Sequence, residues 1–124
     1  MTSVLNVDSI AAKDGTSPVG LTKQEACKVR FNYDQDNNTI KSSLNTSSVT
    51  DHSTGQFSIT VTNNMSDADF AIAGLAQTDN HNSGALSVNG TNWAAGTVRY
   101  LNASVGNTLQ DVDNNSAAYF GGLA

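Results

Sequence analysis

Residues 47–62, SSVTDHSTGQFSITVT, carry the clearest pattern of apolar and polar positions in the chain. Phe57, Ile59 and Val61 alternate there with hydroxyl side chains, and this period of two places the apolar groups on one face of a strand. Residues 51–55, just before, accept turn geometry because Gly tolerates a positive φ and Asp and Ser can bond their own backbone. The stretch therefore predicts a β-hairpin whose second strand is half-buried.

Similar short patterns recur along the chain. Phe31 and Tyr33 alternate with polar side chains, which predicts a strand with one face in the core. Residues 69–76 place Phe70 and Ile72 on one face and small apolar side chains on the other, which predicts a strand buried on both sides. The residues expected to form the core are Phe31, Phe57, Ile59, Val61, Phe70 and Ile72.

A second hairpin is predicted around Asn89-Gly90, because both central residues of a type I′ turn need a positive φ. Residues 85–88 and 91–94 would be its two arms. Further strands are expected at residues 39–45, 97–101 and 114–120. Roughly eight or nine short strands, with turn signals about every 8 to 12 residues, predict an all-β fold, a single small antiparallel β-sandwich.

Residues 1–27 differ from the rest of the chain. Val4, Leu5, Val7 and Ile10 form a short apolar stretch, and turn-forming residues follow it. This segment is too short to hold its own core, so it is a strand laid on the main domain, an arm that docks on another subunit, or a tail that orders on assembly. The sequence thus predicts an extended N-terminal arm or attachment segment at 1–27 and a β-sandwich domain at 28–124.

The composition suggests that assembly supplies part of the core. Hydrophobic residues make up 38% and charged residues 14% of the chain, against about 45–50% and about 25% in ordinary globular domains. A net charge of −5 with only six basic residues argues against nucleic acid as a partner, because binding phosphates needs clustered Lys and Arg.

No apolar run approaches the ~18–20 residues that a membrane-spanning helix needs, so no membrane association is expected. The N-terminal sequence MTSVLNVDS has neither the basic nor the apolar region of a signal peptide. We therefore expect the protein to be made in a cytosol and to stay there unless another process releases it.

The sequence offers little catalytic or metal-binding chemistry. The single Cys27 permits neither an internal disulfide nor a thiolate metal cluster. Residues 34–45 begin like a calcium loop, but Thr39 and Asn45 stand where such a loop needs Gly and a bidentate Glu, so a polar turn is favoured. No cofactor or metal is expected.

The two histidines, His52 and His81, both lie in polar stretches. A hydrolase triad would need one of them to contact a serine and a carboxylate, but no nucleophile motif supports this. We expect surface histidines and no enzyme activity. Trp93 beside Asn92 could stack on a sugar ring or fill the core. With His81 in the loop at 77–84, these residues form the candidate glycan contact: Trp93, Asn92 and His81.

Three stretches resemble a family of short tail-fibre or structural virion proteins of tailed bacteriophages, especially marine ones. The stretches are LNVDSIAAKDGTSPVGLT at 5–22, KVRFNYDQDNNTIKSSLNTSSVTDHSTGQFSITVTNNMSDADFAIAG at 28–74 and TVRYLNASVGNTLQDVDNNSAAYFG at 97–121. They cover the strand ending in Val-Asp-x-Ile, the central hairpin and the closing strands. Lys28 stands where the family often has Trp, and His52-Ser53 replaces a more usual Asn-Gly.

The resemblance implies a β-sandwich that assembles as a homotrimer on the virion surface, as a tail fibre or as a capsid fibre or decoration protein without enzyme activity. Its expected partners are copies of itself and other virion proteins of the capsid or tail. The alternative is a receptor-binding module that contacts host surface polysaccharide through its loops.

Overall fold

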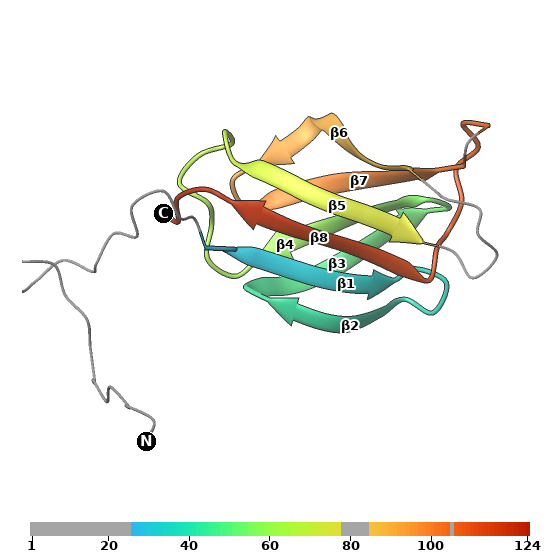
Figure 1. Ribbon diagram of the computed structural model, residues 1–124, viewed down its shortest axis with the longest axis horizontal. Coiled ribbons are helices and arrows are strands. Elements are labelled where there is room, and N and C mark those ends of the chain that lie inside the picture. The colour runs from blue at the N-terminus through green and yellow to red at the C-terminus, as the bar shows by residue number, and fades with distance from the viewer. Residues whose placement is uncertain (1–25, 78–84, 105) are drawn as a thin grey trace, which may run out of the picture.

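The computed structural model describes residues 26–77, 85–104 and 106–124 of the chain (Figure 1). Eight strands form two antiparallel four-stranded sheets, ordered β2-β1-β8-β5 and β3-β4-β7-β6. The strands are β1 (Val29–Asp34), β2 (Thr39–Leu44), β3 (Thr46–Ser53), β4 (Gln56–Val61), β5 (Ala71–Gln77), β6 (Ala85–Ala94), β7 (Thr97–Ala103) and β8 (Asn114–Phe120). The predicted all-β sandwich is therefore confirmed. The proposed arm lies outside the described residues apart from Ala26 and Cys27.

The core lies between the two sheets and is rich in aromatic side chains. The rings of Phe57 and Tyr100 stack at 5.2 Å between centroids, and Phe31 meets Phe57 edge to face at 6.1 Å. Of the six residues expected in the core, five are buried and Ile72 is partly buried against them. The period-two pattern of each strand places these side chains on the inner face.

The structure contains the hairpin predicted at residues 47–62, formed by β3 and β4. Gly55 at its turn has a φ of 68°, a value that glycine adopts without steric cost. The Gly55 amide also donates to Asp111 Oδ1 at 2.6 Å. The turn is therefore fixed by the long segment before β8 as well as by its own sequence.

The predicted hairpin at Asn89-Gly90 is wrong. These residues lie inside β6, which is one strand and pairs with β7 along its length except for a register shift between Val88 and Trp93. Asn89 Oδ1 accepts hydrogen bonds from the Thr91 amide at 3.2 Å and the Thr91 hydroxyl at 2.6 Å. The Asn side chain thus supports a bulge within an edge strand, because pairing with β7 overrides the local turn preference.

The prediction that residues 69–76 are buried on both sides is also wrong. β5 is an edge strand, and Ala71, Ala73 and Leu75 on its outer face are exposed. The predicted alternation is confirmed, because Ile72 packs against the core. What differs is that no second layer of the described chain covers the outer face.

A buried contact between two amide side chains joins the sheets through the core. Asn102 in β7 donates to Asn115 Oδ1 in β8 at 2.5 Å, and both side chains are fully buried. Asn115 in turn donates to the carbonyls of Tyr33 and Val112 at 3.2 and 3.1 Å. Buried amides that find partners in this way fix the relative register of the two sheets.

No helix among the described residues is long and apolar enough to cross a membrane.

Candidate functional site

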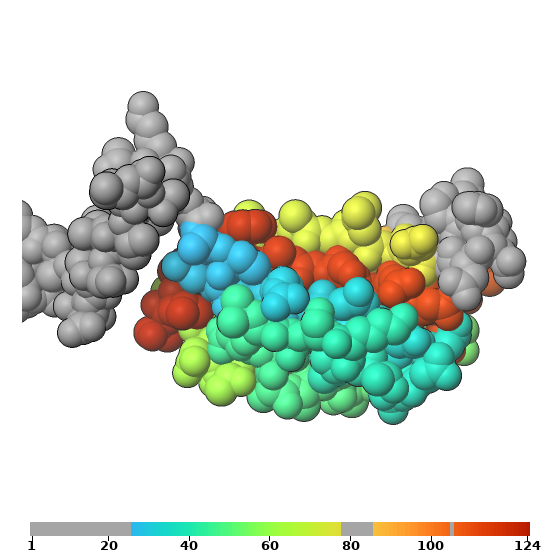
Figure 2. Space-filling view, turned by 60° about the horizontal axis from the view of Figure 1, so that its bottom comes forward, coloured from blue at the N-terminus to red at the C-terminus, as the bar shows by residue number. Residues whose placement is uncertain are grey.

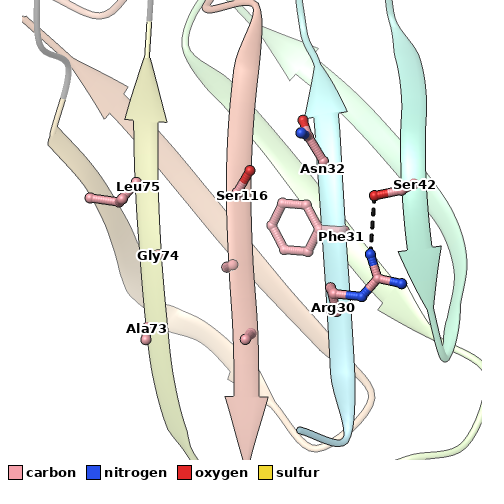
Figure 3. A pocket seen from close by; sticks show the side chains of 10 residues that line it. Arg30, Phe31, Asn32, Ser42, Ala73, Gly74, Leu75 and Ser116 are labelled. Atoms are coloured by element: carbon pink, nitrogen blue, oxygen red, sulfur yellow. Dashed lines mark hydrogen bonds between the residues drawn. The ribbon is translucent and has the colours of Figure 1, made fainter.

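The outer face of the β2-β1-β8-β5 sheet holds a hollow (Figure 3). We call this hollow, with a volume of about 600 Å³, the outer groove. It runs over the middle of β1, β8 and β5. Figure 2 shows that face obliquely, with red β8 between blue β1 and yellow β5. The residues that line it are Arg30, Phe31, Asn32, Ser42, Ala73, Gly74, Leu75, Ser116, Ala117 and Ala118.

Strand register explains why this face is hollow. Along one cross-strand row Arg30 pairs with Ala118, and Ala118 with Ala73. Along the next row, Asn32 pairs with Ser116, and Ser116 with Leu75. Because the outward side chains of β8 in these two rows, Ser116 and Ala118, are small, the longer side chains of β1 and β5 stand on either side of a trough.

The chemistry of the groove is that of a contact surface. Leu75 leaves 78% of its surface exposed, more than any other large apolar side chain in the described chain. Arg30 is the charged residue among the lining side chains, and its Nη1 donates to Ser42 Oγ at 3.2 Å. Asn32 Oδ1 is buried and has no hydrogen-bond partner within the described chain. The lining residues include no histidine, cysteine or carboxylate.

The outer face of the other sheet carries several hydroxyl side chains, together with Arg99 and Leu101 of β7. Ser48 pairs with Thr60 and Thr50 with Ser58 across β3 and β4, and Thr60 pairs with Thr97 in β7. This hydroxyl face contains a second, smaller depression of about 290 Å³. Its lining residues are His52, Ser58, Thr91, Asn92, Trp93, Ala94, Thr97 and Arg99.

His52 and Ser58 form a pair in this depression that sequence reasoning did not find. His52 Nε2 lies 2.8 Å from Ser58 Oγ. A nucleophilic serine also needs a carboxylate to orient the histidine, but the neighbouring Asp51 accepts a hydrogen bond from Gln35 Nε2 at 3.2 Å. Ser58 itself is buried. The pair therefore provides two of the groups of a triad, and sequence spacing alone gave no signal for it.

The structure describes two of the three residues that were predicted to contact a glycan. The Trp93 ring packs on Phe70 at 5.3 Å between centroids, and Trp93 contacts the core, which agrees with the core alternative. Asn92 is exposed at the rim of the smaller depression. His81 lies outside the described residues. So does the whole predicted attachment set: Val4, Leu5, Val7 and Ile10.

The turn between β1 and β2 is held by its own side chains. Asp34 Oδ1 accepts from the Asn37 amide at 3.0 Å, and Lys41 Nζ lies 3.2 Å from Asp34 Oδ2. The hydrogen bond from the Asn37 backbone amide, and after it those from the Asn37 and Lys41 side chains, lower the pKa of the Asp34 carboxyl. A hydrogen bond with Asp113 raises the pKa of Asp36. Within the described ranges, no three His, Cys, Asp or Glu side chains are arranged to hold a metal ion.

The outer groove could not be found by inspecting the sequence, because it depends on three strands in register. Two weak signals were present in the small residues around Gly74 and in Ser116 and Ala118. Each is uninformative until β8 is known to lie between β1 and β5.

No family model, curated protein or solved structure matches this chain. The fold and the groove define it as a two-sheet β-sandwich with one face that carries several hydroxyl side chains and one face hollowed over small apolar residues.

Proposed function

We propose that this chain is a non-enzymatic structural module that assembles with copies of itself. The observation that supports this best is the outer groove, where the most exposed large apolar side chain, Leu75, stands beside small residues on an otherwise open sheet face. Monomeric proteins seldom leave a hollowed apolar face uncovered unless it binds something. The lack of charge over most of this face suits contact between subunits.

The energetics favour assembly. The net stability of a domain is about 5–15 kcal/mol, and this chain draws it from one core between its two sheets. Burial of apolar surface contributes about 25 cal/mol per Å². Covering Leu75 and the groove in a complex would therefore add a useful fraction of the total.

The biological setting that we propose is the virion of a tailed bacteriophage. It is motivated by the resemblance of residues 5–22, 28–74 and 97–121 to short virion proteins. In this proposal the protein is a homotrimeric tail-fibre or capsid fibre or decoration module. It is made in the host cytoplasm and attached to other virion proteins through residues 1–27, with Val4, Leu5, Val7 and Ile10 as contacts.

Sedimentation velocity on the full chain tests self-assembly directly. We expect a trimer at micromolar concentration and an apparent melting temperature that falls on dilution, because association stabilises the folded state by mass action. A chain that sediments as a monomer, with a melting temperature independent of concentration, would contradict the proposal. For the virion setting, the chain should be found in purified phage particles and traced in an image of them.

A receptor-binding role is a second candidate, supported by the smaller depression on the hydroxyl face. Its polar lining of His52, Arg99 and exposed Asn92 offers the donors and acceptors that a saccharide needs. Asn92→Ala and His52→Ala should then weaken binding to host polysaccharide, while Thr50→Ala, outside the depression, should not. Equal binding by all three variants would remove this candidate. Trp93 is less suitable for the test because it packs on Phe70.

A further inference from the structure

The four edge strands of the sandwich differ in how they are protected against pairing with another strand. β2 carries Lys41 and pairs with β1 through a register shift. β3 carries Asp51 and His52 and has two register shifts, and β6 is bulged after Val88. Charges and bulges of this kind are the usual means by which proteins block unwanted strand pairing.

β5 has none of these features. Its sequence AIAGLAQ contains no charge and no proline, and its seven residues pair with β8 without a register shift, from Ala71 with Phe120 to Gln77 with Asn114. In the part of the chain that the structure describes, β5 has a paired neighbour on one side only. A regular, uncharged edge strand is the kind of edge to which a further strand adds.

The surroundings of β5 favour an apolar incoming strand. Leu75 projects from β5 on the outer face, where the groove lies beside it (Figure 3). A strand added along β5 would place its outward side chains next to Leu75 and extend the floor of the groove. Such a strand needs a few apolar residues and little charge.

We propose that residues 4–10 of a neighbouring copy add to the free edge of β5 as a further strand. This segment, VLNVDSI, is as long as β5 and carries a single charge, Asp8. Its apolar residues, Val4, Leu5, Val7 and Ile10, need a surface to cover them. The inference rests on the proposed self-assembly and names the contact that produces it.

The length of the chain before Ala26 permits this contact. Residues 11–25 connect the segment to the described domain and can span up to about 50 Å when extended. Within one copy, the three strand spacings from β1 to a strand beyond β5 amount to only about 15 Å, so the connecting residues are long enough to reach the same edge of an adjoining copy as well. A strand given by each copy to the next is a head-to-tail contact, and contacts of this type close into rings such as a trimer.

The first test compares two lysine substitutions on the same sheet. Leu75→Lys places a charge beside the free edge, whereas Leu44→Lys, at a position that is 47% exposed on β2, places it at the opposite edge. Both sites are exposed, so both variants should fold. Leu75→Lys should raise the dissociation constant of the oligomer by roughly 30-fold or more, and Leu44→Lys should leave it unchanged. Removal of residues 1–10 should have the effect of Leu75→Lys.

The second test asks whether the segment comes from a neighbour. In a Cys27→Ser background, one chain carries Val7→Cys and another carries Leu75→Cys. After mixing and treatment with a short bifunctional thiol reagent, we expect a covalent species that contains both chains. A third chain, which carries both cysteines, shows whether the contact forms within one molecule. Cross-linking within this chain, without cross-linking between the two singly substituted chains, would overturn the proposal.

The outcomes separate this inference from the proposed function. If the unmodified chain is an oligomer that survives both Leu75→Lys and loss of residues 1–10, self-assembly stands and strand addition to β5 is wrong. If the unmodified chain is a monomer, both are wrong.

Discussion

The hydroxyl of Tyr100 in β7 donates to the hydroxyl of Tyr119 in β8 at 2.6 Å, which joins the two sheets inside the core. Removing one partner leaves the other hydroxyl buried and unsatisfied. Tyr100→Phe and Tyr119→Phe should therefore each lower the free energy of unfolding by about 1–3 kcal/mol. The double variant should lose less free energy of unfolding than the sum of the two single losses, because it leaves no buried hydroxyl without a partner. Urea unfolding measures all three, and additive losses would show that the bond contributes nothing.

Alkaline pH should unfold the protein, because all three of its tyrosines are buried. Burial raises the pKa of Tyr33 from 10.0 to about 12, and burial also raises the pKa values of Tyr100 and Tyr119. Each raised pKa contributes stability that is fully present below pH 10.0 and is lost as the pH rises through the folded value. Phenolate absorbance and circular dichroism should change together. A phenolate signal with the ordinary pKa of about 10 and an intact fold would contradict this.

Gly55→Ala should destabilise the hairpin of β3 and β4. At a φ of 68°, a Cβ at Gly55 would lie 2.7 Å from both the Asn102 carbonyl oxygen and the Gln110 amide nitrogen. Strain of this kind costs about 1–3 kcal/mol per residue before any clash is counted. Gly90→Ala is the matched control, because a Cβ there meets nothing within 4 Å. Thermal unfolding should show a clear loss for Gly55→Ala and little change for Gly90→Ala.

Asn115→Ala should be among the most destabilising single substitutions. It removes the donor to the carbonyls of Tyr33 and Val112 and the acceptor for Asn102, all in the interior. We expect a loss of about 3 kcal/mol or more. Asn63→Ala, at an exposed position after β4, should change the stability by no more than about 0.5 kcal/mol. Similar losses for the two variants would mean that the buried amides do not matter for stability.

Sequence patterns predicted the fold where a strand shows one apolar and one polar face. Phe57, Ile59 and Val61 in β4 are such a case: the strand and its buried face follow from the period of two, and the turn before it follows from Gly55. The pattern at 69–76 shows which residues of β5 share a face but not whether anything covers that face. The periodicity of a sequence shows which residues of a strand share a face, whereas the burial of that face depends on which other strands pack against it.

The remaining errors have the same origin. Asn89-Gly90 favours a tight turn locally, but the pairing of β6 with β7 places it in a bulge. Asn102 and Asn115 carry amide side chains, a type that mostly lies at the surface, yet each finds its partner in the interior. The groove needs three strands in register, and the His52 to Ser58 contact needs two. None of these relationships between strands is encoded at a fixed spacing along the chain.

The difference between the two broad faces has a practical consequence for experiments on this protein. The chain has four lysines. Lys13 and Lys23 belong to the N-terminal segment, Lys28 directly precedes β1, and Lys41 lies in β2 of the sheet that carries the outer groove. Amine-reactive dyes, biotin reagents and lysine coupling to sensor surfaces would therefore modify the segment and the sheet through which assembly is proposed. A cysteine introduced at exposed Thr50, with Cys27 replaced by serine, would anchor the protein through its hydroxyl face and leave Leu75 and the edge of β5 accessible.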